Sequence, residues 1–434
     1  MKDYIVENKQ FLGLMFLWFI VGAFVPTAMY FFVPISVIAL KKKQLDKEIF
    51  IGFFLVLIFS DSRQSELLWA QSVKNIYIVL LLLFQLVDKK RGVSKISVFS
   101  LFIPFLLFSL VCLFNSPIIS IAIQKTISYF VLIYVVTNSV FVFLNEDPDD
   151  FFRSIVYFVM LLLLIGLVIY VFDKNVATLV GRYRGVFGNP NGIGMFSLVF
   201  FLLINVLLDY NADIFRKNEV RFFYSILFLS MIMSGSRSAI FSVLLFLSLK
   251  KVYKISYFLG FIIMFAFALA YQYISLNIET IIKLFSLQDF FRIDTLEEGS
   301  GRLVAWKYAW DNIQHSIFVG KGFDYTEFLF AQNSSYLSML GHQGNAHNSF
   351  LTFWLDTGLV GLFLFIIGFV GNFIKAAKVS AIALPLMYTL ICSSFFESWL
   401  TGSLNPVTIQ VWIMLSIMLW KFKDKTNENP LPIH

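Results

Sequence analysis

Charged residues are scarce in this chain. Only 14% of its 434 residues are Asp, Glu, Lys or Arg, whereas soluble domains average about 25%. Hydrophobic residues make up 59%, including 53 Phe, 18 Tyr and 8 Trp. So few charges cannot cover this much apolar surface in water, which excludes a secreted enzyme, a disordered tail and a nucleic-acid-binding protein. The composition predicts an all-α polytopic integral membrane protein.

Patterns that bind metals or activate nucleophiles are also missing. Cys112 and Cys392 both lie in apolar runs and are expected to be small buried hydrophobic residues. The sequence has no Cys/His/Asp cluster with metal-ligand spacing, no P-loop and no Gly-x-Ser-x-Gly elbow. We therefore expect neither a metal nor a cofactor. Acidic residues are absent from the middle of most apolar runs, which argues against an ion-coupled transporter.

The long apolar runs define the predicted membrane helices. A spanning helix needs about 20 mostly apolar residues, or somewhat fewer where the bilayer thins, so we predict 12–14 of them. The first run continues to Leu40 without a small-residue cleavage site, which predicts a retained anchor, folded as a hairpin near Pro26. The predicted spans are 11–40, 48–60, 67–87, 96–115, 119–143, 152–172, 191–208, 222–233, 239–249, 255–274, 349–373, 379–396 and 406–420.

Positive charge predicts the orientation of these spans. Eighteen of the 34 Lys and Arg residues lie in six short clusters that fall on one side if the spans alternate, and the positive-inside rule makes that side cytoplasmic. The net charge of +7 is therefore a topology signal and requires no nucleic acid. The clusters are Lys41/Lys42/Lys43/Lys47, Lys89/Lys90/Arg91, Arg216/Lys217/Arg221, Lys250/Lys251/Lys254, Lys375/Lys378 and Lys421/Lys423/Lys425.

One long loop, residues 275–348, falls on the opposite side. It carries 5 basic and 8 acidic residues, and it is too rich in aromatic residues to be disordered. Long loops that are not disordered are usually functional. We predict four parts: membrane helices with short outer loops over 1–274, a large periplasmic cap containing helices over 275–348, C-terminal transmembrane helices over 349–420, and a cytoplasmic tail over 421–434.

Arginines stand out on the predicted outer face. Arg182 and Arg184 lie in a Gly-rich turn that ends in Asn189-Pro190-Asn191, where Asn191 can cap the following helix. Arg237, in Ser236-Arg237-Ser238, lies between two short spans. Two guanidinium groups at the bilayer surface can form a fork for phosphate oxygens, but they can equally contact lipid headgroups. An Arg near membrane depth costs about 2.5–3.5 kcal/mol and is usually retained for function; an interfacial anchor is the alternative for Arg237.

Two further candidates lie in the long loop. Ser300 is placed to cap a helix on which Arg302, Trp306, Trp310 (or Ala309) and Ile313 share one stripe, although an amphipathic helix on the membrane surface would give the same pattern. His347-Asn348 precedes a predicted span that Asn348 or Ser349 would cap. The helix dipole disfavours imidazolium there, so a neutral His347 can accept a proton near pH 7. The alternative for His347 is a capping or headgroup contact.

Taken in order, these motifs resemble the O-antigen polymerase/O-antigen ligase family of bacterial envelope biogenesis. The resemblance covers roughly residues 180–362 and rests on three patterns. They are Arg182-x-x-Gly185-x-Phe187-x-Asn189-Pro190-Asn191, then Ser236-Arg237 followed by Gly301-Arg302 with Trp306, and His347-Asn348 followed after nine residues by Gly358-Leu359-Val360-Gly361.

The resemblance implies a GT-C-like membrane glycosyltransferase that acts on undecaprenyl-pyrophosphate-linked glycans without a metal. It implies catalytic roles for His347, Arg237 and Arg302. Arg182 is a candidate substrate-binding residue. Arg184, Asn348 and Trp306 are further substrate-binding candidates that would make supporting contacts. The arginines would stabilise the leaving pyrophosphate, and His347 would take the proton of the acceptor hydroxyl. Expected partners are the lipid-linked donor and acceptor, the lipid bilayer and a chain-length regulator protein, with the site facing the periplasm from the bacterial inner membrane.

Several functions fit these motifs. The first is a polymerase of lipopolysaccharide O-antigen or capsular repeat units, which moves the growing chain onto a new lipid-linked unit. The second is an O-antigen ligase, which moves the finished chain onto lipid A–core. The Asn-Pro-Asn turn and the many short spans favour the polymerase. A transporter or flippase of lipid-linked sugars should instead line a cavity with charges inside its spans, and a structural scaffold gives no reason for the spaced Arg and His residues.

We predict that Arg237→Ala, Arg302→Ala and His347→Ala each abolish polymer formation while the protein still inserts and accumulates. The arginines would bind pyrophosphate and the histidine would act as a base worth about 10²–10⁴-fold in rate. The measurement is the polysaccharide ladder beside an immunoblot of the membranes. Full activity of His347→Ala would contradict the general-base role, and retained activity of Arg302→Lys would mean that charge matters more than a bidentate fork.

Overall fold

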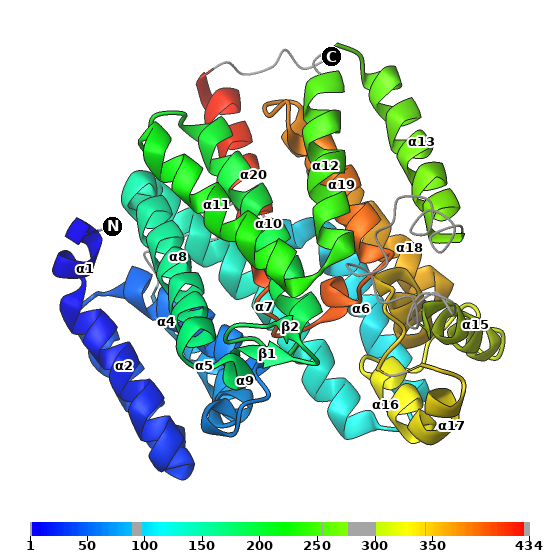
Figure 1. The fold of residues 1–434 in the computed structure, drawn as a ribbon, viewed down its shortest axis with the longest axis horizontal. Coiled ribbons are helices and arrows are strands. Elements are labelled where there is room, and N and C mark those ends of the chain that lie inside the picture. Colours follow the sequence, from blue (N-terminus) through cyan, green and yellow to red (C-terminus); the bar gives the residue numbers. More distant parts are fainter. Residues whose placement is uncertain (1, 89–97, 254, 277–300, 343, 429–434) are drawn as a thin grey trace.

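The computed structural model describes residues 2–88, 98–253, 255–276, 301–342 and 344–428, and these residues form a bundle of helices (Figure 1). The strands in this part of the chain are β1 (Thr178–Leu179) and β2 (Arg182–Tyr183), an antiparallel pair in which Thr178 lies opposite Tyr183. The helices are α1 (Lys2–Glu7), α2 (Lys9–Phe24), η1 (Pro26–Ala28), α3 (Met29–Lys42), α4 (Asp46–Asp61), η2 (Ser65–Leu67), α5 (Trp69–Val87), η3 (Val98–Phe102), α6 (Ile103–Cys112), η4 (Leu113–Asn115), α7 (Ile119–Glu146), α8 (Pro148–Phe172), α9 (Lys174–Ala177), α10 (Pro190–Tyr210), α11 (Lys217–Ser234), α12 (Arg237–Val252), α13 (Tyr257–Leu276), α15 (Arg302–Ile313), α16 (Tyr325–Gln332), α17 (Ser334–Met339), α18 (Ser349–Ala377), α19 (Ala383–Ser394), η7 (Trp399–Thr401) and α20 (Thr408–Glu428).

The helices confirm the predicted class, an all-α polytopic membrane protein. Within the described residues every predicted span overlaps a helix, and the first run is a hairpin of α2 and α3 that turns at Pro26; the start of the span 96–115 lies outside the described residues. Six helical segments of the described chain are long and apolar enough to cross a membrane, and four shorter helices are also apolar. The total of 12–14 spans stays a prediction. The six long segments are Ser65–Val87, Val98–Asn115, Ile119–Glu146, Pro148–Phe172, Pro190–Tyr210 and Ser349–Ala377.

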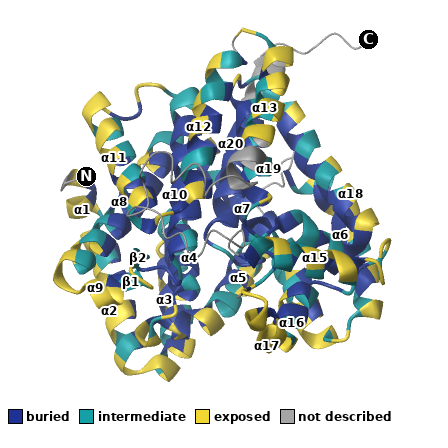
Figure 2. Ribbon diagram, turned by 45° about the vertical axis from the view of Figure 1, so that its right-hand side comes forward, coloured by how far each residue is buried: buried dark blue, intermediate teal, exposed yellow. Residues whose placement is uncertain are grey.

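Helices α7, α10 and α20 form the centre of the bundle. Helix α20 packs against α7, α10 and α18, and α10 and residues 408–419 of α20 are largely buried (Figure 2). Helix α10 is apolar on all sides, as expected of a helix surrounded by others. Its N-terminus is capped by Asn189, whose side-chain oxygen accepts a hydrogen bond from the Gly192 amide at 2.7 Å, with Pro190 at the first helical position. The expected cap at Asn191 was therefore wrong by two residues, and the Asn191 side chain is available for other contacts.

Helix α18 bends sharply at Gly358. This residue has φ 71° and ψ 177°, a region that essentially only glycine adopts. The segment 317–322 crosses the bend and pairs with its backbone: the Leu359 amide donates to the Ile317 carbonyl and the Gly322 amide to the Asp356 carbonyl, both at 2.8 Å. The first glycine of the Gly-x-x-Gly pattern is thus a helix break crossed by a second chain segment, rather than a helix–helix packing contact.

The long loop contains helices, as predicted: α15, α16 and α17 lie between α13 and α18, and α15 and α16 pack against α18. They share a small apolar core that includes Ala305, Ala309 and Ile313. This buried stripe of α15 contains Ala309, whereas Trp310 is 45% exposed, so the alternative with Ala309 is correct. The proposed cap Ser300 lies outside the described residues, and the residue before α15 is Gly301.

We predict that Gly358→Ala lowers the free energy of unfolding by about 1–3 kcal/mol or more. This range is the cost of holding a non-glycine residue in this backbone region. In addition, an added Cβ would lie 2.3 Å from the Phe318 carbonyl oxygen. Gly13→Ala in α2 is the matched control, because a Cβ there meets nothing within 4 Å and alanine favours a helix by about 0.5–1 kcal/mol. The measurement is the thermal unfolding midpoint in detergent. Equal midpoints for the two variants would contradict the tight crossing at Gly358.

Candidate functional site

A buried carboxylate, Glu397, joins side chains from three other parts of the chain. It lies between α19 and η7, and its residue is 8% exposed. Its Oε1 atom accepts hydrogen bonds from Arg302 Nη2 at 2.9 Å and from Asn191 Nδ2 at 3.0 Å. Its Oε2 atom lies 3.2 Å from His347 Nδ1. The structure therefore brings Arg302 and His347, two of the predicted catalytic residues, to one carboxylate.

Arg182 belongs to the same group through Asn191. Its Nη2 atom donates to Asn191 Oδ1 at 2.8 Å, and that amide donates in turn to Glu397. Burial lowers the pKa of Arg182 below its ordinary value, the charges of Arg237 and Arg302 lower it further, and Glu397 opposes them. Arg237 is therefore close enough to act on Arg182. The charges that act on Arg182 are two arginines and one carboxylate, so the group has an excess of positive charge, which favours an anionic ligand.

Helix ends place these arginines. Arg237 is the first residue of α12 and Arg302 is the first residue of α15. Arg182 reaches from β2 to the end of α11, where its Nε atom donates to the Ser234 carbonyl at 2.8 Å. Gly235 makes this approach possible: it has φ 61°, and an added Cβ would lie 3.3 Å from Arg182 Nε. The exposed backbone amides at the start of a helix add a positive partial charge to such a site.

His347 adopts a strained backbone. Its φ is 46°, a conformation that costs a non-glycine residue of order 1–3 kcal/mol and is typical of functional sites. Its amide donates to Asn345 Oδ1 at 3.0 Å. With the proton on Nδ1 donated to Glu397, Nε2 is free of a proton and can accept one. This tautomer is the one that a general base requires, and the carboxylate stabilises the imidazolium that forms when the base takes a proton.

A second histidine packs against the first. The rings of His342 and His347 are 5.9 Å apart at 85°, and His342 is 1% exposed. Burial, followed by the charge of His347, lowers the pKa of His342. This shift favours the neutral form of His342, whose ring packs against that of His347.

The remaining predicted residues lie beside this group. Arg184 is half-buried, and its Nε atom donates to the Val176 carbonyl at 3.2 Å, so this hydrogen bond is to the segment before the β-hairpin rather than to Glu397. Asn348 caps α18: its Oδ1 atom accepts from the amides of Phe350 and Leu351 at 2.9 and 3.1 Å. Trp306 lies one turn after Arg302 and packs against the apolar core of α15 and α16.

Sequence reasoning missed Glu397 and the role of Asn191. Glu397 lies outside the motifs that carried the resemblance, and its only sequence signal is an acidic residue between two apolar spans. The segment around Glu397 is also hydrogen-bonded to the two residues that follow His347. Ser349 Oγ donates to the Glu397 carbonyl at 2.8 Å, and the Asn348 amide donates to Ser398 Oγ at 2.9 Å. Within the described residues, no group of three or more His, Cys, Asp and Glu side chains could hold a metal ion.

Comparison with known protein families gives a match to part of the chain. A family model described as O-antigen ligase matches residues 222–366. The matched segment contains Arg237, Arg302 and His347, whereas Arg182, Asn191 and Glu397 lie outside it. No curated protein matches the chain.

We predict that Arg182→Ala weakens the binding of inorganic pyrophosphate about 10- to 100-fold, because it removes a charged hydrogen-bonding group worth about 1.5–3 kcal/mol. Arg184→Ala removes the same charge from the same turn, but its guanidinium faces the Val176 carbonyl, so its effect should be clearly smaller. The measurement is calorimetric titration of the purified protein in detergent. Equal losses in the two variants would mean that general charge, rather than the group around Glu397, binds the anion.

Proposed function

We propose that this membrane protein, whose residues 222–366 match a family model described as O-antigen ligase, is a metal-independent glycosyltransferase of bacterial envelope polysaccharide synthesis. More narrowly, we infer a repeat-unit polymerase that moves a growing undecaprenyl-pyrophosphate-linked glycan onto a new lipid-linked unit. The observation that carries the proposal is the meeting of Arg182, Arg302 and His347 around Glu397. This arrangement supports the proposal because guanidinium groups suit an anion and the neighbouring imidazole suits a proton transfer.

The arginines act on the donor. In the transfer, the bond between the anomeric carbon and the pyrophosphate oxygen breaks, and negative charge develops on the leaving lipid pyrophosphate. Arg182, Arg237 and Arg302 stabilise that charge, and Arg–phosphate pairs are strong because they are charge-assisted and often bidentate. Such prearranged groups are usually the largest single contribution to catalysis. The Glu397 carboxylate holds Arg302 in place before the donor binds.

His347 acts on the acceptor. A sugar hydroxyl of the new repeat unit attacks the anomeric carbon, and its proton passes to Nε2 of His347. The new glycosidic bond forms as the bond to pyrophosphate breaks. Glu397 orients the ring through Nδ1 and offsets the positive charge of the imidazolium. The proton is later released to solvent, which returns the histidine to its neutral form.

The proposed location is the bacterial inner membrane, with the site at the periplasmic face. The six basic clusters support this orientation, because they place the segments that carry the arginines and His347 on the opposite side from the cytoplasm. Donor and acceptor would enter laterally from the bilayer, and a chain-length regulator protein is a proposed partner.

An O-antigen ligase is the second candidate, and the description of the matched family favours it. The ligase needs the same donor chemistry and differs in its acceptor, the lipid A–core. The Asn-Pro-Asn turn supplies Asn191 to the shared site, so it fits both reactions. A transporter or flippase of lipid-linked sugars is less well supported, because the arginines and His347 meet at helix ends and in turns rather than along a central cavity.

We predict that deletion of the gene leaves a single repeat on the lipopolysaccharide core and removes the ladder, and that the parental gene restores it. A gene carrying Glu397→Gln should fail to restore the ladder at normal protein levels, because the amide cannot offset the charges of Arg302 and His347. The control is Glu66→Gln, which changes an exposed carboxylate and should restore the ladder fully. The measurement is a gel of lipopolysaccharide beside the parent. Bare core with long chains on the lipid carrier would identify a ligase, and an unchanged ladder would contradict both activities.

A further inference from the structure

A second group of charged side chains lies outside the cationic site around Glu397. Lys74 is in the first two turns of α5 and Lys125 is in the first two turns of α7, and both helices belong to candidate membrane spans. The predicted orientation places both lysines at the outer ends of these spans, where positive charge is least expected. An ionisable residue within a span is a candidate functional residue, so the two lysines need an explanation of their own.

Acidic side chains from two other helices accompany these lysines. Lys125 Nζ lies 2.9 Å from Asp324 Oδ1, directly before α16. Glu327 follows on the first turn of α16, and the charges of Lys125 and Lys74 act on it. Asp61, the last residue of α4, also interacts with the charge of Lys74. Four segments that are distant in sequence thus contribute to one group of charges.

The start of α16 is fixed in place by a buried carboxylate of α18. Asp356, which is 2% exposed, accepts hydrogen bonds at Oδ1 from the amide and the hydroxyl of Thr326, at 2.9 and 2.7 Å. Its Oδ2 atom accepts from the Asp324 amide at 3.2 Å. Asp324 itself has φ 73°, which is uncommon for a residue other than glycine. The position of Glu327 therefore does not depend on the ion pair of Lys125 alone.

Two of these charges have no contact partner. Within the described residues, Lys74 Nζ and the Glu327 carboxylate form no hydrogen bond or ion pair, although each charge acts on the other. Lys74 is half-buried and Glu327 is exposed, so a ligand can reach both. An ammonium group only donates hydrogen bonds and a carboxylate only accepts them, whereas a hydroxyl does both. A ligand that carries neighbouring hydroxyls can therefore pair with both side chains at once.

The balance of charge separates this group from the cationic site. Apart from the buried Asp356, three positive and three negative side chains form one series of interacting charges: Lys74, Lys125 and Arg63, and Asp61, Asp324 and Glu327. Such a group does not favour an anion, whereas an excess of positive charge does. A carboxylate on the ligand would meet the like charge of Glu327, and an amine would meet that of Lys74, which opposes both ligands. An uncharged, polyhydroxylated ligand meets neither repulsion.

One turn connects this group to the cationic site. The Gly188 amide donates to Asp61 Oδ2 at 3.3 Å, and three residues later Asn191 donates to Glu397 at 3.0 Å. The two charged groups therefore lie on either side of the same short segment. A glycan whose reacting end lies at the arginines and His347 can extend along this segment.

We propose that Lys74 and Glu327 are specificity-determining residues that bind an uncharged sugar ring of the glycan and reject acidic and amino sugars, an inference that rests on the proposed function. One hydroxyl of the ring accepts a hydrogen bond from Lys74, and a neighbouring hydroxyl donates to Glu327. This sugar subsite holds a ring of the growing chain or of the new repeat unit. The hydroxyl chemistry is the same for both, and the experiment distinguishes them.

The test is transfer between a lipid-linked donor and a lipid-linked acceptor by the purified protein, with kcat and the KM of each substrate determined separately. Lys74→Met and Glu327→Gln each remove one charge and keep the length of the side chain. Their matched controls are Lys174→Met and Glu66→Gln, which change exposed charges on the same predicted face.

We expect Lys74→Met and Glu327→Gln each to raise the KM of the same substrate about tenfold, which corresponds to the loss of one hydrogen bond to a charged group. The kcat should stay within threefold, and the controls should leave both constants within twofold. A raised donor KM places the ring in the growing chain, and a raised acceptor KM places it in the new unit. Unchanged KM values, a fall in kcat alone, or effects on different substrates would overturn the inference.

A charged analogue gives a readout that a merely structural role would not move. Analogues of the affected substrate carry a carboxylate in place of the hydroxymethyl group on one ring at a time. At least one of them should show a KM about tenfold or more above that of the neutral substrate in the wild type. Glu327→Gln should reduce this ratio at least threefold because it removes the repelling charge, and Lys74→Met should increase it. A ratio that neither variant changes would contradict the subsite.

Binding of a free oligosaccharide separates failure of the subsite from failure of the proposed function. The probe is one repeat unit cleaved from the envelope polysaccharide of the host, without lipid or pyrophosphate, in a calorimetric titration. Lys74→Met should weaken its binding about tenfold and leave that of inorganic pyrophosphate within twofold. A wild type that binds the oligosaccharide but transfers nothing would contradict the proposed function and support the subsite. Absence of binding at millimolar oligosaccharide, or equal weakening of both ligands, would overturn the subsite.

Discussion

The site depends on one buried negative charge in a region of positive charge. Glu397 accepts hydrogen bonds from Arg302 and Asn191 and contacts His347, and Asn191 connects Arg182 to it. Without this carboxylate, cationic side chains from separate segments would repel one another in a poorly hydrated place, where charges interact more strongly than in water. With it, they are held together before any ligand binds. An anionic substrate then completes a site that already has an excess of positive charge.

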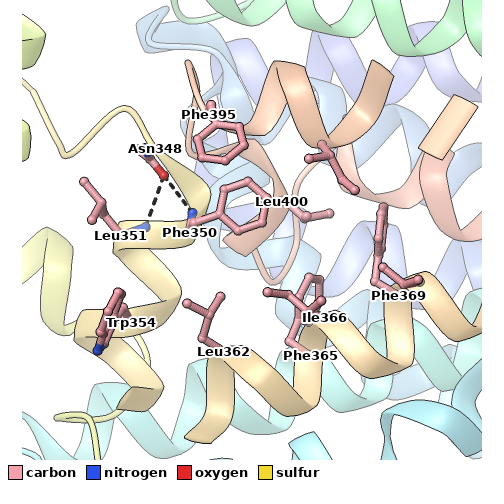
Figure 3. A pocket seen from close by; sticks show the side chains of 12 residues that line it. Asn348, Phe350, Leu351, Trp354, Leu362, Phe365, Ile366, Phe369, Phe395 and Leu400 are labelled. Carbon is pink, nitrogen blue, oxygen red and sulfur yellow. Dashed lines mark hydrogen bonds between the residues drawn. The ribbon is translucent and has the colours of Figure 1, made fainter. Parts of the chain in front are cut away.

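Helix α18 connects the parts of this site. His347 and Asn348 directly precede it, its bend at Gly358 is crossed by segment 317–322, and residues on both sides of the bend line an apolar cavity between α18 and the segment from α19 to η7 (Figure 3). The bend therefore has two consequences: it attaches the helices of the long loop to the membrane domain, and it turns a flat helix surface into a pocket. A single backbone feature thus relates the position of Arg302, on α15, to that of His347.

Much of this organisation could be predicted from the sequence. Apolar runs indicate helices that a bilayer can surround, and within the described residues each predicted span overlaps one helix or, for 11–40, a hairpin of two. Arginines and a histidine at the ends of such runs are costly unless they have a use, so Arg182, Arg237, Arg302 and His347 could be selected. The capping residue of α10 and the exposure of Trp310 were harder, because each depends on which neighbour packs against a given helix turn.

The sequence by itself determined that the chain is an all-helical membrane protein and which segments carry its cationic residues, because apolar run length and charge placement are local properties. Only the tertiary structure decided which of these residues meet. Arg182 and Arg184 are two residues apart and chemically identical, yet one reaches Asn191 and the other the Val176 carbonyl. Glu397 is far from all of them in sequence, and its role exists only because α10, α15 and α18 begin at the same place.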